Sequence, residues 1–262
     1  MHFCLMKSQH KIKILGIDFF NGDEQSVVNS LKAHGGLLVV PAGPALVNIR
    51  KDAEYYRSLQ NADITIPDSG YMSLLWNLTH KEKINRLSGL EFITTFVNDK
   101  TVQASDKIIL VDPNEKESVK NRELLIQKGF QPEAIHSYLA PFYGKKNVSD
   151  ETLLHKIKDL KPTFVLINIG GGTQEKLGLY LKENLDYKPA IICTGAAIAF
   201  LTGVQANIPT WGVKAYLGWF FRCLHQPKIF IPRYLKAFPL AALMFRYGAK
   251  NPCSAAIPSL SA

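Results

Sequence analysis

Cysteine is scarce in this sequence, and the spacing of the few cysteines excludes several kinds of site. Cys4, Cys193, Cys223 and Cys253 form no Cys-x-x-Cys pair, and no cysteine–histidine cluster has the spacing of metal ligands. We therefore expect reduced thiols, no bound metal and no other cofactor. The histidines show no pairing at metal spacing and no Ser/His/Asp arrangement, so none of them is assigned a role.

Long apolar runs are also missing. None approaches the roughly 20 residues that a membrane-spanning helix needs. The first 16 residues are interrupted by Lys7, His10, Lys11 and Lys13, unlike the apolar core of a signal peptide. The composition, 47% apolar and 20% charged, is otherwise that of an ordinary globular chain. These features predict a cytoplasmic protein.

Acidic residues are absent after Asp186, and this absence locates the net charge of +9. Eight lysines and arginines follow that position, and from about Asn207 they alternate with aromatic residues and helix-breaking prolines. We expect an α/β domain over residues 1–205, a basic appendage of short helices over 206–250 and a flexible tail over 251–262.

The appendage has two candidate partners. Lysine and arginine contact anionic lipid head groups, and tryptophan, tyrosine and phenylalanine favour the lipid interface. Nucleic acid competes for cations that are interleaved with aromatic residues. The apolar content of residues 238–245 favours a membrane surface over nucleic acid. The expected location is therefore peripheral, on the inner face of the cell membrane.

Short β-branched apolar runs alternate with longer segments of helical spacing. The runs cover residues 11–20, 37–41, 62–67, 107–111, 163–169 and 190–193, and the helical segments include 45–60, 115–128, 150–160 and 174–185. Such alternation predicts a Rossmann-like parallel sheet with helices on both faces. Ligands of these sheets bind beyond the carboxyl ends of the strands. The turn of Pro41, Ala42 and Gly43 follows one of these ends.

A second strand end reads Pro67-Asp68-Ser69-Gly70 and leads into an apolar helix. An aspartate in this place can act as a general base that takes a proton from a hydroxyl in the pocket. Alternatively, Asp68 caps the following helix through its free amides. The motif alone leaves both interpretations open.

Glycines mark a third strand end. Gly170, Gly171 and Gly172 precede Thr173, Gln174 and Glu175, and this order is neither a Walker A loop nor a G-x-G-x-x-G fingerprint. Glycines before a helix N-terminus let a phosphate approach the backbone, so a nucleotide diphosphate fits here. A tight turn without a ligand fits equally well. Thr194 and Gly195 follow a fourth strand, where small residues permit close approach of a ligand or a helix.

In this order, the motifs together resemble the WecB/TagA/CpsF family, or family 26 glycosyltransferases. The resemblance is carried by residues 52–57, 62–63, 67–70, 86–89, 172–176 and 200–203, and in the appendage by 217–219, 221–222, 226–227 and 232–234. It implies inverting transfer of N-acetylmannosamine or a related sugar from a UDP donor to a polyprenyl diphosphate-linked saccharide, without a metal. It is also compatible with a homo-oligomer.

The resemblance implies roles for individual residues. Asp68 is the expected general base, Gln174 and Glu175 belong to the nucleotide-binding loop, and Arg222 and Arg233 bind diphosphate or lipid head groups. The chain departs from the family where Val40-Pro41-Ala42 replaces Thr-x-Asn, and where Ala199 and Gly218 replace acids. A membrane-associated nucleotide-sugar sensor or scaffold without catalysis is therefore the alternative function. A dinucleotide-dependent oxidoreductase lacks its glycine fingerprint.

Overall fold

The computed structural model describes residues 10–104, 107–144, 148–195, 197–203, 228, 232 and 235–253. Eight strands of these residues form one sheet in the order β1-β2-β4-β3-β8-β7-β5-β6. The strands are β1 (Lys11–Ile14), β2 (Ile17–Phe20), β3 (Gly36–Val39), β4 (Ile64–Thr65), β5 (Ile108–Asp112), β6 (Ile135–Leu139), β7 (Phe164–Ile167) and β8 (Ala190–Cys193). β1 and β2 pair antiparallel and the other neighbours pair parallel, which confirms the predicted α/β fold.

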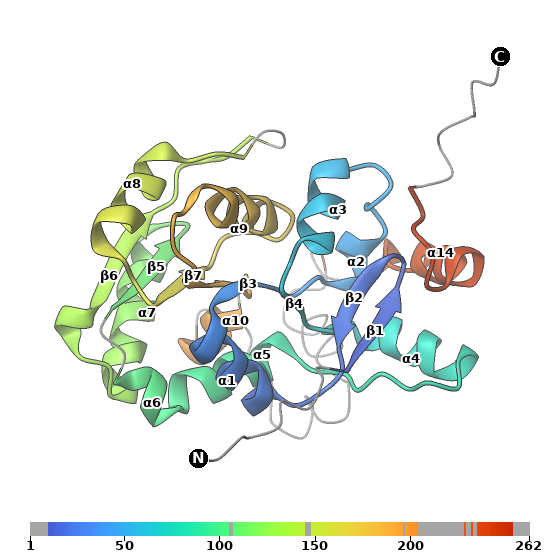
Figure 1. Ribbon diagram of the computed structural model, residues 1–262, viewed down its shortest axis with the longest axis horizontal. Coiled ribbons are helices and arrows are strands. Elements are labelled where there is room, and N and C mark those ends of the chain that lie inside the picture. Colours follow the sequence, from blue (N-terminus) through green and yellow to red (C-terminus); the bar gives the residue numbers. More distant parts are fainter. Residues whose placement is uncertain are drawn as a thin grey trace.

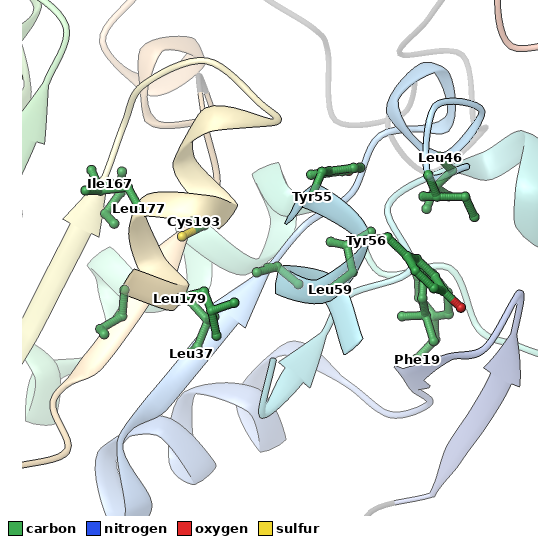
Figure 2. Packing of buried hydrophobic residues seen from close by; sticks show 14 of the residues in the cluster. Phe19, Leu37, Leu46, Tyr55, Tyr56, Leu59, Ile167, Leu177, Leu179 and Cys193 are labelled. Atoms are coloured by element: carbon green, nitrogen blue, oxygen red, sulfur yellow. The ribbon is translucent and has the colours of Figure 1, made fainter. Parts of the chain in front are cut away.

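Helices cover both faces of the sheet (Figure 1). The described helices are α1 (Glu24–His34), α2 (Gly43–Leu46), α3 (Ala53–Gln60), α4 (Gly70–Thr79), α5 (Gly89–Asn98), α6 (Lys100–Gln103), α7 (Glu115–Lys128), η1 (Pro132–Ala134), α8 (Glu151–Leu160), α9 (Thr173–Asn184), α10 (Ala197–Leu201) and α14 (Pro239–Tyr247). One buried cluster joins α3, α8 and α9 to the sheet, and a second joins α1, α5, α7 and α10. Figure 2 shows the first cluster, where Leu177 of α9 lies beside Ile167 of β7 and Leu179 of α9 lies beside Leu37 of β3.

Two predicted elements are split in the structure. The run over residues 11–20 is a hairpin, because Leu15 and Gly16 adopt left-handed φ values of 52° and 75° and reverse the chain between β1 and β2. The helical segment over 45–60 is divided into α2 and α3. Asp52 begins the second of these helices by accepting a hydrogen bond from Tyr55 N–H at 3.0 Å.

The end of the described chain packs on the α/β core. Leu240 and Met244 of α14 are buried in the cluster that contains α3, α8 and α9. The N–H of Leu15 donates to Gly248 O at 2.8 Å, and the N–H of Gly16 donates to Ala249 O at 3.1 Å. The chain after residue 235 is therefore integrated with the β1–β2 hairpin. The division into a domain of residues 1–205 and an appendage of 206–250 stays a prediction.

Asp63 fastens the amino-terminal ends of β3 and β4 to neighbouring cations. Its carboxylate accepts from Leu37 N–H at 2.8 Å and lies 2.7 Å from Lys182 Nζ and 3.1 Å from Lys188 Nζ. Burial acts to raise the pKa of Asp63, but the hydrogen bonds from Lys182, Leu37 and Lys188 outweigh it, so the pKa is lowered.

Replacing Asp63 with Ala is therefore expected to lower the free energy of unfolding by about 2 to 3 kcal/mol, the cost of a lost charged hydrogen-bond partner. Because the folded pKa is depressed, this contribution is present above the unfolded carboxyl's pKa of about 3.9 and is lost as pH falls through the folded pKa. Urea unfolding of the unchanged protein and of Asp63→Ala at pH 7 and pH 3 measures this contribution. If the difference between their free energies of unfolding is as large at pH 3 as at pH 7, this explanation is wrong.

Candidate active site

The turn after β4 presents Asp68 at the carboxyl edge of the sheet. Its Oδ1 accepts a hydrogen bond at 3.0 Å from the N–H of Gly89, the first residue of α5. This amide has no partner within its own helix, because it belongs to the first turn of α5. No described residue donates to Oδ2, and the side chain is partly exposed. Asp68 therefore has one oxygen fixed in place and one oxygen available to a ligand.

Ser69, and not Asp68, caps the helix that follows. The hydroxyl of Ser69 accepts from Met72 N–H at 3.2 Å at the start of α4. The interpretation of Asp68 as the cap of this helix is thus wrong. Ser69 is the N-cap of α4, and the adjacent Asp68 accepts its hydrogen bond from the start of α5.

Arg86 also belongs to this site, although its motif over residues 86–89 did not predict a role for it. Its Nε donates to the carbonyl oxygen of Asp68 at 3.2 Å, and its Nη1 lies 4.0 Å from Glu91 Oε2. The side chain is only 13% exposed, so a cation is held beside the turn that carries Asp68. The sequence signal was the Ser88 capping box, which places Glu91 at the start of α5 and opposite this arginine.

The turn after β3 packs directly on the turn after β4. A Cβ atom at Gly43 would lie 2.7 Å from the hydroxyl of Ser69, so only glycine allows this approach. Pro41 is buried, and Ala42 stands at the N-terminus of α2 without a side-chain cap. A Cβ at Gly89 would lie 3.1 Å from Val40. The structure thus brings these sequence-predicted residues together around Asp68.

The loop after β7 faces open space. A Cβ atom at Gly170, Gly171 or Gly172 would meet no atom within 4 Å. Gly172 has a φ of 90°, which a side chain would strain, and Thr173 follows it as the first residue of α9. The loop therefore leaves open space at the N-terminus of a helix of 12 residues, whose positive dipole end favours an anionic group.

Gln174 and Glu175 support this loop from its buried side. Gln174 Oε1 accepts from Gly195 N–H at 2.7 Å, and Gln174 Nε2 donates to Glu175 Oε1 at 3.2 Å. The other oxygen of Glu175 accepts from Gly172 N–H at 2.6 Å. Burial raises the pKa of Glu175 to about 7, although these hydrogen bonds oppose the shift. The two side chains connect the loop after β7 to the turn after β8.

Thr194 and Gly195 complete the edge. Thr194 is 8% exposed, and its hydroxyl oxygen has no hydrogen-bond partner among the described residues. Gly195 takes a φ of 59° and lies against Gln174. The remaining predicted residues, Arg222 and Arg233, lie outside the described residues. Within the described ranges, no group of three or more histidine, cysteine, aspartate or glutamate side chains could hold a metal ion.

No helix among the described residues has both the length and the apolar composition to span a bilayer. Those helices that are apolar, such as α5 and α14, have 10 and 9 residues.

A known protein family matches most of this chain. The glycosyl transferase family described as WecG/TagA/CpsF matches residues 12–253. The chain belongs to this family. The match covers the sheet, both turns around Asp68, the glycine loop and α14, so the family resemblance found in the sequence is confirmed and the protein is a glycosyltransferase.

Relatives in Staphylococcus aureus are similar over most of their length. A protein of strain NCTC 8325 / PS 47 is 23% identical over 221 residues, which cover 82% of this chain and 84% of the relative. A protein of strain MRSA252 is 22% identical over the same shares. Both are named N-acetylglucosaminyldiphosphoundecaprenol N-acetyl-beta-D-mannosaminyltransferase.

Proposed function

We propose that this protein transfers N-acetylmannosamine or a related N-acetylhexosamine from a UDP-sugar to a polyprenyl diphosphate-linked saccharide, with inversion, in cell-envelope or exopolysaccharide synthesis. The observation that carries the proposal is the juxtaposition of a half-free carboxylate, Asp68, with an open glycine loop at the same sheet edge. The names of the relatives support the sugar and the lipid-linked acceptor.

The donor's diphosphate is assigned to the loop after β7. Three glycines leave open space before the N-terminus of α9, although the N–H groups of Gly172 and Gln174 are already bonded to Glu175 and Gly170. The positive end of the α9 dipole stabilises the leaving nucleoside diphosphate, which takes up negative charge as the bond to the sugar breaks. The fixed geometry of Gln174 and Glu175 keeps the loop in place before the donor arrives.

Asp68 is assigned to the acceptor. The free carboxylate oxygen of Asp68 takes the proton from the acceptor hydroxyl. The hydroxyl oxygen of the acceptor attacks the anomeric carbon at the same time, and the bond between that carbon and the diphosphate oxygen breaks. The Gly89 amide and the Arg86 guanidinium hold the turn, so the carboxylate needs no reorganisation at the moment of reaction. A single displacement of this kind inverts the anomeric configuration.

Exposed apolar side chains on α4 and α14 support the peripheral location. Leu74 and Leu78 of α4 are 57% and 74% exposed, and Phe238 and Phe245 at α14 are 63% and 69% exposed. The two helices are in contact, with the Tyr71 and Phe238 rings 6.1 Å apart. Figure 1 shows them side by side at one end of the molecule. The exposed cations within the described residues 235–253 are Lys236, Arg246 and Lys250. We assign this α4–α14 surface to an anionic lipid bilayer.

The double variant Leu78→Asp, Phe245→Asp is expected to bind vesicles containing anionic lipid at least ~10-fold more weakly, because each of these exposed apolar side chains contributes roughly 1.5 to 3 kcal/mol when the bilayer buries it. Val119→Asp on α7, also an exposed apolar residue, is the matched control and should bind like the unchanged protein. Vesicle sedimentation measures both. Equal binding by all three proteins would exclude this surface.

The proposed reaction is tested with purified protein, a panel of UDP-, GDP- and dTDP-sugars and a short-chain polyprenyl diphosphate-linked acceptor. Release of UDP that requires the acceptor, survives a chelator and yields an inverted anomeric linkage by NMR is the expected result. Preference for a GDP- or dTDP-sugar would overturn the donor assignment. Binding of a nucleotide sugar without turnover of any donor would replace the transferase by a sensor or scaffold.

A further inference from the structure

A row of polar side chains lies on one side of the sheet, at the last residue of β5 and directly after β7 and β8. The register pairs Val111 with Ile167 and Leu166 with Ile192, so Asp112, Asn168 and Thr194 stand level with one another. Asp112 is fully buried and Asn168 is 4% exposed. Residues two positions earlier belong to the cluster under α5, α7 and α10, so these side chains point to that face.

One hydrogen bond joins the side chains of Asp112 and Asn168, and one oxygen of each side chain has no hydrogen-bond partner among the described residues. The Nδ2 of Asn168 donates to Asp112 Oδ1 at 2.7 Å, and the Nδ2 of Asn121 donates to the same oxygen at 2.7 Å. Asp112 Oδ2 and Asn168 Oδ1 are buried without a partner among the described residues. Leaving both of these buried oxygens without a donor costs free energy, because almost all buried acceptors in folded proteins are hydrogen-bonded.

We propose that Asp112 carries a proton at neutral pH and donates it from Oδ2 to Asn168 Oδ1, which closes a cyclic acid–amide pair between β5 and β7. A single proton then satisfies both remaining oxygens. Each group donates once to the other, as in the hydrogen-bonded pairing of any carboxylic acid with a primary amide.

The surroundings of Asp112 favour the neutral acid. Burial raises its pKa, although the nearby side chains of Asn168, Asn121 and Ser118 act in the opposite direction. On α7 the charged group that acts on it is Glu117, whose negative charge also raises the pKa. The residues of α10, Ala197–Leu201, include no titratable side chain. In α5 the acid Glu91 is occupied by Ser88 N–H at 3.1 Å.

The pair has a positioning role that rests on the proposed donor site. Asn168 stands two residues before Gly170, where the glycine loop begins, and Ile169 between them is buried. A Cβ on Gly195 would lie 3.6 Å from Ile169 O, so the turn after β8 packs against this connection. The acid–amide pair therefore fixes the strand end from which the donor loop departs.

Three other hydrogen-bond arrangements could supply donors to these oxygens, and in all three Asp112 is ionised. Ser118 can donate to its free oxygen, Thr194 can donate to Asn168, or an ordered water can donate to both oxygens. The discriminating measurement is the 13C chemical shift of the Asp112 carboxyl carbon in protein labelled at aspartate, assigned by its loss in Asp112→Asn. A protonated acid at pH 7 supports the pair. A carboxylate shift at pH 7 overturns it.

Thermal unfolding gives an independent test that needs no activity. Asparagine reproduces the shape and the donor of the protonated acid without having to hold a proton. Because the folded pKa of Asp112 is raised, the stability of the unchanged protein falls as pH rises from the unfolded pKa toward the folded one. At pH 8 the melting temperature of Asp112→Asn should therefore be higher than that of the unchanged protein. The difference between the two melting temperatures should become smaller toward pH 5. A lower melting temperature of Asp112→Asn at pH 8 contradicts the proposal.

The positioning role is tested by rescue. Asp112→Ala is expected to raise the donor KM about 10-fold with a smaller change in kcat, and Asn in the same place should restore most of the loss. Equal KM values for the Ala and Asn variants would overturn the role in the donor loop. If no donor is turned over at all, the proposed reaction fails, but the carboxyl shift and the melting temperatures still decide the acid–amide pair.

Discussion

Replacing Asp68 with Asn is expected to lower kcat by about 10²- to 10⁴-fold, the usual contribution of a positioned general base. The donor's affinity should stay nearly unchanged, because the glycine loop lies on a different strand end and the substituted amide oxygen can still accept from Gly89 N–H. Steady-state kinetics at saturating acceptor measure kcat. Calorimetric titration of the donor measures its affinity.

A matched variant separates chemistry from general loss of charge. Asp18→Asn also removes a carboxylate, but that residue is exposed on β2 and pairs with Lys13 at 3.4 Å. It should retain kcat. If Asp68→Asn retains kcat as well, another group accepts the proton. If donor affinity falls by as much as kcat, the turn after β4 has a structural role instead.

The elements that the sequence predicted best are those with local signals at both ends. The predicted helix over 115–128 is α7, which begins where Asn114 accepts from Glu117 N–H and ends at Gly129 with a φ of 107°. The predicted strand over 190–193 is β8, a run of four buried residues. In both cases the chain carries the cap, the turn residue or the apolar run within its own segment.

The elements that the sequence did not predict depend on distant parts of the chain. β6 contains the polar residues His136 and Ser137 because it is an edge strand, with Lys156 Nζ donating to Ser137 O at 2.8 Å from α8. The β1–β2 turn uses Leu15 in a left-handed conformation, which few residues other than glycine adopt. Neither the edge position nor the strained turn can be inferred from periodicity alone.

The same distinction applies to the site. Asp68 and the glycine loop could be placed at the sheet edge because strand ends are visible in the sequence as a change from apolar to small or polar residues. The acid–amide pair could not, since Asp112 and Asn168 are 56 residues apart and meet only through the β5–β7 register. Arg86 likewise reaches Asp68 from 18 residues further along the chain. Contacts of this kind follow from strand order, which the sequence does not state.

Replacing Gly171 with Val is expected to remove donor binding without disturbing the fold. A Cβ at Gly171 would meet no atom within 4 Å, and its φ lies outside the left-handed range, so a side chain that begins there adds no left-handed backbone strain to the free protein. The melting temperature should therefore stay within about 2 °C, as for other exposed substitutions. The valine methyl groups would, however, occupy the space assigned to the diphosphate, so the donor KM should rise about 100-fold or more.

Two neighbouring variants make this result specific. Gly171→Ala adds a smaller obstacle and should raise the donor KM less than valine does, because the loss grows with the volume placed before the helix N-terminus. Gly172→Ala should behave differently, since its φ of 90° adds roughly 1 to 3 kcal/mol of backbone strain and lowers stability as well as affinity. Donor binding by Gly171→Val with unchanged affinity would show that the diphosphate binds elsewhere. Stability lost in proportion to affinity would assign the loop a structural role only.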